Sequence, residues 1–120
     1  MINQEDLAKF TGSSTNFKHW SKKILYTEGI QFVAEEAQAY WLIDAIASYQ
    51  TNELLSKHPE LKEFQLWQLE VNADKTAVLT CSVDSDCHPD VVQNLEFTDF
   101  PLQQIKLYVC QTVLMLPSEY

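Results

Sequence analysis

One carboxylic acid stands in an unusually apolar stretch of this sequence. Asp44 lies in AYWLIDAIAS, where seven of its nine neighbours are apolar. If the stretch is helical, Tyr40 lies one turn before Asp44 and Ser48 one turn after it, so the three polar side chains share one face. Because an unpaired carboxylate is costly to bury, Asp44 must be hydrogen-bonded, exposed or protonated.

This pattern leaves two interpretations of Asp44 open. In the structural one, Asp44 lies at the helix surface or bonds to Ser48, Tyr40 or loop backbone. In the functional one, it is a general base or ligand anchor with a raised pKa, in a pocket with Tyr40 and Ser48. His19 and His88 are the candidate neighbours, and the sequence places neither of them beside Asp44.

A second group of residues has the spacing of a calcium-binding loop. Asp84, Asp86 and Asp90 alternate in the required way, but Pro89 stands at the sixth position, where such a loop needs Gly. Leu95 stands at the twelfth position, where the loop needs Glu. An EF-hand is therefore excluded, and the three aspartates are candidates only for a looser divalent-metal site.

The cysteines do not indicate a zinc site or a disulfide framework. Cys81, Cys87 and Cys110 are odd in number and irregularly spaced, and Cys87-His88 has no second ligand pair. No glycine-rich phosphate loop occurs, so no cofactor is expected. The N-terminus is polar and acidic and the longest apolar run has five residues, which predicts a cytoplasmic protein.

The charge balance narrows the class of partner. Seventeen acids face eight Lys and no Arg, for a net charge of −9. Such a chain lacks the electrostatic footprint of a nucleic-acid binder, and anionic membranes would repel it. No basic residue lies between Lys75 and Lys106, an interval that contains Asp84, Asp86, Asp90, Glu96 and Asp99. These acids predict either a solvated edge or a surface that docks on a basic partner, including an imitation of a phosphate chain.

The apolar periodicity changes near the middle of the chain. Residues 30–50 have the pattern of a helix with a break near Ala37, and residues 17–27 could form a short hairpin. Alternation with a period of two predicts strands at 65–71, 76–83, 105–109 and 113–116, and Leu95 and Phe97 repeat the pattern.

We therefore expect one α+β domain over residues 1–120, mostly helical in 1–62 and mostly strand in 63–120. The N-terminal helices should pack on one face of a mainly antiparallel sheet of four to six strands, with a meander in the C-terminal half. The predicted core consists of Trp41, Leu42, Ile46, Tyr49, Trp67, Leu69, Val71, Leu79, Cys81, Phe97, Ile105, Leu107 and Val109.

Three stretches, AYWLIDAIASYQ, FTDFPL and LMLPSEY, together with LYTEGI, resemble a family of small uncharacterised proteins of bacteria, mobile elements and phages. That family is known only as a domain of unknown function. The resemblance implies a free-standing domain in an intracellular bacterial setting, and it implies no activity, cofactor or site residue. One departure is Cys110-Gln111-Thr112, where a turn with Gly or Asp is expected.

The leading hypothesis is a small acidic binding protein without catalytic activity, which acts on a basic protein partner as an accessory or inhibitor protein of a mobile element. The first alternative is an enzyme or small-ligand binder with a pocket around Tyr40, Asp44 and Ser48. The second is a self-associating unit, a homodimer, since exposed strand edges are natural pairing sites.

Overall fold

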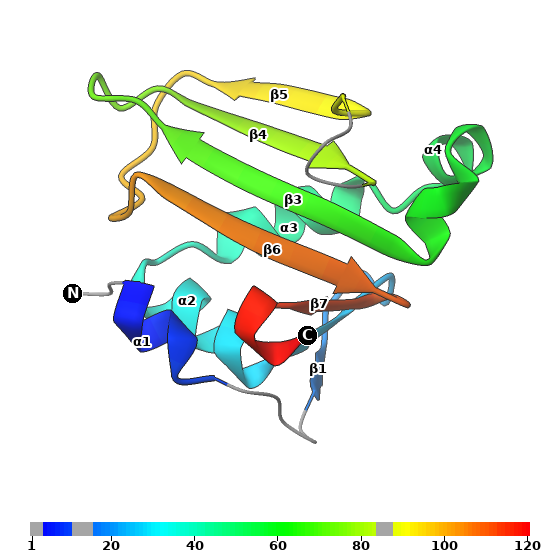
Figure 1. Cartoon of the computed structure of the whole chain (residues 1–120), viewed down its shortest axis with the longest axis horizontal. Coiled ribbons are helices and arrows are strands. Elements are labelled where there is room, and N and C mark those ends of the chain that lie inside the picture. Colours follow the sequence, from blue (N-terminus) through cyan, green and yellow to red (C-terminus); the bar gives the residue numbers. More distant parts are fainter. Residues whose placement is uncertain (1–3, 11–15, 84–87) are drawn as a thin grey trace.

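The structure is a computed structural model that describes residues 4–10, 16–83 and 88–120. Helices and strands alternate irregularly along the chain (Figure 1). The α-helices are α1 (Gln4–Ala8), α2 (Glu28–Glu36), α3 (Tyr40–Ser48) and α4 (Asn52–Lys57), and two 3₁₀ helices are η1 (Pro59–Lys62) and η2 (Pro117–Glu119). The strands are β1 (Asn16–Lys18), β2 (Leu25–Thr27), β3 (Phe64–Val71), β4 (Ala77–Ser82), β5 (Val91–Leu95), β6 (Gln104–Cys110) and β7 (Val113–Met115). The expected α+β class is confirmed.

Within the described residues the strands form one seven-stranded sheet in the order β1-β2-β7-β6-β3-β4-β5. All neighbours are antiparallel except β2 and β7, which are parallel. The prediction of four to six strands was too low, because the short strands β1 and β2 join the sheet through β7. The predicted meander is also wrong beyond β5, since β6 returns to pair with β3 and completes a Greek-key order.

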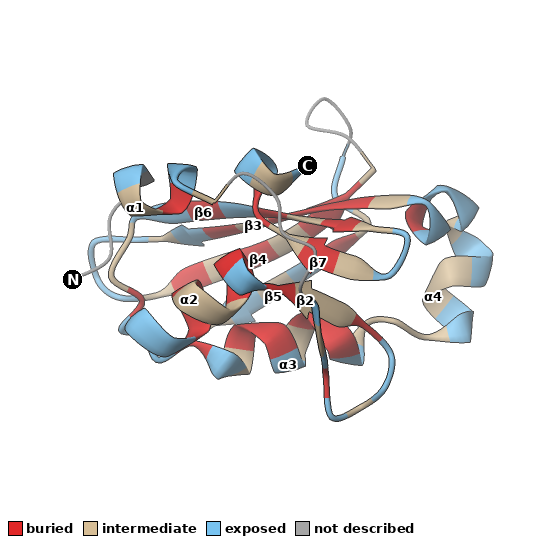
Figure 2. Ribbon diagram, turned by 90° about the horizontal axis from the view of Figure 1, so that it is seen from below, coloured by how far each residue is buried: buried red, intermediate tan, exposed pale blue. Residues whose placement is uncertain are grey.

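The helices lie on both sides of this sheet. Figure 2 shows α2 and α3 along one face, and α1 and the C-terminal end on the other. Side chains of α2 and α3, among them Ile30 and Leu42, line a small internal space together with Leu107 of β6 and Leu114 of β7. The main core therefore lies between these two helices and the sheet.

The alternating strand residues that were predicted to be buried do face this core. Trp67, Leu69, Leu79 and Cys81 are completely buried. Of the thirteen predicted core residues, nine are buried, and Trp41, Tyr49 and Val71 are partly buried against the core. Phe97 is wrong, with 71% of its surface exposed. The alternation that suggested its burial continues past Leu95, but the strand ends there.

The break predicted inside residues 30–50 separates α2 from α3. Thr27 caps the start of α2 by accepting a hydrogen bond from the Ile30 amide, and Ala37 ends the helix. Gln38 then adopts a positive φ of 51°, which turns the chain into α3. This turn places Asp44 on the side of α3 that faces the β1–β2 loop.

The C-terminal segment is tied to the start of α2 by one carboxylate. Glu119 accepts hydrogen bonds from the Thr27 hydroxyl at 2.6 Å, the Leu116 amide at 3.0 Å and the Gly29 amide at 3.4 Å. A Cβ at Gly29 would come within 2.5 Å of the Glu119 carboxylate, so this close approach requires glycine. The contact fixes η2 against the body of the protein.

The β6–β7 turn is built from two residues with positive φ, Gln111 at 49° and Thr112 at 69°. These are the positions where the sequence suggested Gly or Asp. A β-branched residue in this region is strained. Neighbouring segments hold the turn, because the Gln111 amide donates to the Glu63 carbonyl and the Thr112 carbonyl accepts from the Leu25 amide.

Candidate functional site

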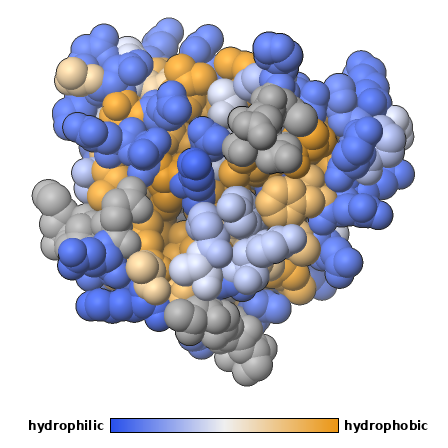
Figure 3. Space-filling view, in the orientation of Figure 1, coloured by the Kyte–Doolittle hydropathy of each residue, from blue (hydrophilic) through white to orange (hydrophobic). Residues whose placement is uncertain are grey.

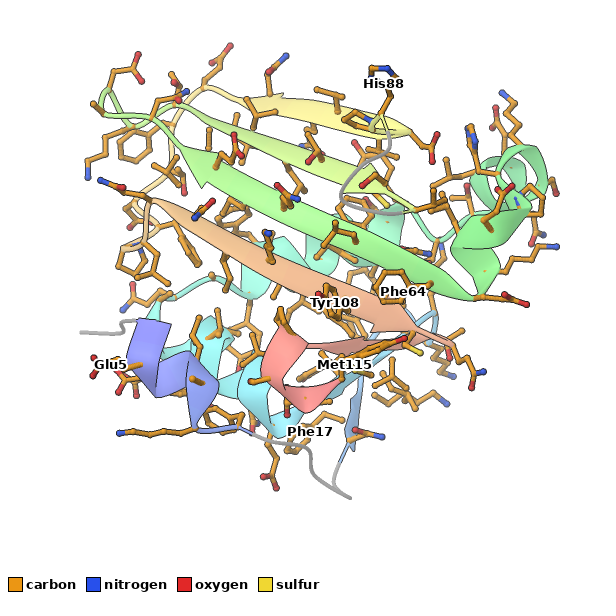
Figure 4. The ribbon with its side chains drawn as sticks, viewed as in Figure 1. Glu5, Phe17, Phe64, His88, Tyr108 and Met115 are labelled. Atoms are coloured by element: carbon orange, nitrogen blue, oxygen red, sulfur yellow. The ribbon has the colours of Figure 1, made fainter. Side chains whose placement is uncertain are left out.

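Asp44 has a histidine partner that the sequence could not assign. The loop between β1 and β2 brings His19 to α3, and His19 Nε2 lies 2.7 Å from Asp44 Oδ1. His19 is buried, with 5% of its surface exposed, whereas half of the Asp44 side chain reaches water. His88, the other candidate, lies beside the start of β5 (Figure 4).

The hydrogen bonds around His19 indicate which tautomer of the ring is present. The Ser21 amide donates to His19 Nδ1 at 3.1 Å, so this nitrogen carries a lone pair and the ring proton is on Nε2, where it is donated to Asp44. Ser21 Oγ lies 2.7 Å from the same Nδ1 and accepts from the Lys23 amide at 3.3 Å.

Ser21, His19 and Asp44 thus stand in the order of a hydrolytic triad. The Lys23 amide is aimed at the Ser21 oxygen itself, so it is not free to stabilise an oxyanion. The arrangement closes the loop on itself and fastens it to α3.

Trp20 extends this cluster to the surface. Its indole Nε1 donates to Asp44 Oδ1 at 3.0 Å, the same oxygen that His19 contacts. The ring is 78% exposed and its centroid lies 5.1 Å from that of His19. Asp44 therefore accepts two side-chain hydrogen bonds from one loop, and both donors are aromatic.

Tyr40 and Ser48 do not share these contacts. The Tyr40 hydroxyl donates to Glu35 at 3.4 Å, and partial desolvation followed by the Glu35 charge raises the pKa of Tyr40. The Ser48 hydroxyl donates to the carbonyl of Ala45 in its own helix at 2.6 Å. The main pockets in the described part of the chain are lined by other residues.

The acidic candidates are spread along β5. Asp90 precedes this strand and Glu96 follows it, so the two lie at opposite ends, about 20 Å apart for an extended segment of this length. Asp90 lies 3.4 Å from His58 Nδ1, and Asp84 and Asp86 fall outside the described residues. In the described part of the chain, no three His, Cys, Asp or Glu side chains are grouped as a metal site.

Cys81, a residue type that can act as a nucleophile or metal ligand, is inert in this position. It lies in the core face of β4 and is completely buried. Burial, with a smaller contribution from Asp90, raises the pKa of the Cys81 thiol to about 12. The thiol is therefore protonated at neutral pH and packs as a small apolar group.

The loop after β5 forms a pocket that the sequence did not predict. Thr98 and Phe100 are buried, and the Thr98 amide donates to the Lys75 carbonyl at 2.8 Å while Thr98 Oγ1 accepts from the Phe100 amide at 3.2 Å. These two side chains point inward. Phe97, which precedes Thr98, and Asp99, which lies between Thr98 and Phe100, are therefore exposed. Together with Leu95, Thr98 and Trp41 of α3, they line a pocket of about 260 Å³.

A buried polar network was also missed. Gln65, 2% exposed, exchanges hydrogen bonds of 2.8 and 2.9 Å with Gln50 and accepts from Trp67 Nε1 at 2.8 Å. Its amide also donates to the Leu61 carbonyl at 3.0 Å. The signal in the sequence was an inward-facing glutamine in a strand whose other inward residues are apolar, which demands such partners.

Among the described residues, none of the helices has the length and apolar character needed to cross a membrane. No curated protein and no solved structure matches the chain. A family model described as a family of unknown function, DUF6876, matches residues 1–120. Since this match spans the whole chain, the protein belongs to the DUF6876 family.

Proposed function

We propose that this protein is a noncatalytic binding protein whose partner presents a basic side chain next to an apolar one. The observation that carries the proposal is the exposed pocket formed by Trp41, Leu95, Phe97, Thr98 and Asp99. The Phe97 side chain is exposed to solvent and does not contribute to the core. Exposed aromatic side chains of this kind are typical anchors of protein interfaces.

The chemistry of this pocket favours a cation. Asp99 supplies a carboxylate at the wall, and Glu96 stands next to Phe97 in the loop. The face of an exposed aromatic ring also attracts Lys and Arg side chains. Lys75 lies near Thr98, but the same turn carries Asp74, so the acids outnumber the bases here.

The net charge of the chain is −9, so it repels nucleic acids and anionic membranes. This charge favours a protein as the partner. We extend the proposal to a cytoplasmic protein that serves as an accessory or inhibitor protein of a mobile element. The resemblance described above supports this setting.

A titration with a defined probe tests the proposal. ¹⁵N-labelled protein is titrated with an octapeptide of alternating Lys and Leu, and with one of alternating Glu and Leu as a control. The Lys peptide should shift the amide signals of Trp41 and of residues 95–99, and binding should weaken as NaCl rises from 50 to 500 mM. Equal binding of the Glu peptide, or shifts confined to other surfaces, would contradict the proposal.

Matched variants sharpen this titration. Asp99→Asn and Phe97→Ser should each weaken binding of the Lys peptide at least fivefold. Glu60→Gln removes the same charge from η1, and Val92→Ser removes an exposed apolar side chain from β5, so both should bind like the unmodified chain. If the two controls lose as much affinity as the pocket variants, the interaction is general electrostatic attraction and the assigned pocket is wrong.

A further inference from the structure

A groove on the other face of the sheet has a different chemistry. It measures about 330 Å³ and lies between α1, β6 and the start of η2. Its walls are mainly apolar, with Leu7 and Ala8 from α1, and Leu116 and Pro117 from the C-terminal segment. This volume is at the lower end of the range of small-molecule sites. Figure 3 shows apolar side chains exposed between hydrophilic ones on the face that carries α1 and η2.

The walls of this groove are held in place by hydrogen bonds. Ser118 Oγ donates to the Leu7 carbonyl at 3.0 Å and so joins η2 to α1. Glu119 accepts from the Leu116 amide and the Thr27 hydroxyl, which fixes the C-terminal wall to the rest of the protein. A ligand would therefore enter a preformed site and would not have to order it.

The groove also contains one cation. Lys106 alternates on β6 with the buried residues Ile105 and Leu107, so its side chain faces outward into the groove lining. Among the described residues that line the groove, Lys106 alone carries a formal charge. It is one of the eight lysines in a chain with a net charge of −9.

Glu70 of β3 lies diagonally across from Lys106 on the same face of the sheet, but the two side chains form no ion pair within the described residues. Within the described part of the chain Lys106 has no ion pair, and Asp6 of α1 pairs with Lys9 at 3.6 Å. Glu5 lies on the outer side of α1 and points away from β6 (Figure 4). The groove thus offers an apolar surface and a free ammonium group to the same ligand.

We propose that this groove binds a small carboxylate with a hydrocarbon chain, whose carboxylate contacts Lys106 and whose chain lies against Leu7, Leu116 and Pro117. The apolar wall supplies affinity through burial of hydrocarbon, and the charge selects an acid over an alcohol or an amine. This site is separate from the pocket at Phe97 and does not depend on the function proposed for that pocket.

Decanoate, below the concentration at which it aggregates, is the probe. In protein with ¹³C-labelled Leu methyl groups, decanoate should give saturable shifts at Leu7 and Leu116. Lys106→Met keeps most of the aliphatic stem and should weaken binding about tenfold, whereas Lys106→Arg should retain it. Lys62→Met, which removes a lysine that lines another pocket, is the matched control and should bind decanoate normally.

Comparison ligands test the charge on the unmodified chain. Decanol and decylamine should each bind at least fivefold more weakly than decanoate. The proposal is overturned if decanol binds as tightly as decanoate, if Lys106→Met leaves the affinity unchanged, or if decanoate gives no saturable shifts at Leu7 and Leu116.

Discussion

Removal of the Asp44 carboxylate is the perturbation whose effect can be worked out most fully. Asp44→Ala deprives two donors of their acceptor, His19 Nε2 at 2.7 Å and Trp20 Nε1 at 3.0 Å. The two losses are unequal. Water can reach the exposed indole of Trp20, but the buried His19 ring keeps an unsatisfied N–H, which costs about 1 to 3 kcal/mol.

Two effects reduce this cost. Half of the Asp44 side chain is exposed, so solvent already screens its charge. Alanine is also a better helix former than aspartate, by roughly 0.5 kcal/mol. The net loss of unfolding free energy should be about 1 to 2 kcal/mol, which corresponds to a fall in Tm of roughly 3 to 10 °C for a chain of this size. Asp44→Asn keeps the accepting oxygen and should lose less than half as much.

Urea unfolding followed by tryptophan fluorescence measures these values, since Trp67 is completely buried. Ser48→Ala is the matched control, because Ser48 lies one turn later on α3 and bonds only to its own helix in the described residues. That variant should unfold within about 0.5 kcal/mol of the unmodified chain. An Asp44→Ala variant as stable as the control, or an Asp44→Asn variant as unstable as Asp44→Ala, would refute the structural role assigned to the His19 contact.

Three further changes test other parts of the fold. Gly29→Ala should destabilise the protein by about 1 to 2 kcal/mol despite the better helix propensity of alanine, and should cost less in a Glu119→Ala background, as a double-mutant cycle in urea will show. Gln65→Ala leaves Trp67 Nε1 buried without an acceptor and should lower the unfolding free energy by about 2 to 4 kcal/mol, measured in the same way. Because the pKa of Cys81 is raised to about 12, the unfolded chain releases the thiol proton first as pH rises. The contribution of Cys81 to stability should therefore be intact below about pH 8.5 and be lost as pH rises toward 12, and a Cys81→Ala variant should lack that part of the pH dependence in urea titrations.

The strands that the sequence predicted well are those with one face in the core. Residues 65–71 and 76–83 were expected, and β3 and β4 cover 64–71 and 77–82. Alternation reports the burial of one strand face, so it is informative wherever that face is fully covered. The same rule failed at Phe97, because two apolar residues spaced by two do not show whether the strand continues between them.

The order of the strands was beyond the reach of periodicity. Nothing local distinguishes a β6 that continues a meander from one that returns to β3, because both leave the same side chains buried. The parallel pairing of Leu25 with Val113 joins two segments far apart in the chain, and neither strand is longer than three residues. Short strands carry too few positions to show a period.

The candidate site was predicted in part. The apolar surroundings of Asp44 suggested that it is hydrogen-bonded, exposed or protonated, and in the structure it is half exposed and accepts hydrogen bonds. The histidine that bonds to it lies twenty-five positions earlier in the chain. The hydrogen bonds to Tyr40 and Ser48 that helical spacing suggested do not form, because each of those hydroxyl groups has an acceptor of its own. Spacing along a helix shows which side chains share a face, and tertiary packing decides which of them bond.

The parallel pairing of β2 with β7 has a consequence for synthesis of the protein. Thr27, at the end of β2, donates a hydrogen bond to Glu119, which lies 92 positions later in the chain. While the chain is being translated, the β1–β2 hairpin is made early, and an isolated two-stranded hairpin is only marginally stable. Its edge stays unpaired until the segment 113–119 has left the ribosome, so the nascent chain exposes a pairing edge while the residues between β2 and β7 are made. The sheet therefore cannot be completed before that segment has emerged, and until then the unpaired edge of β2 is open to pairing with other chains.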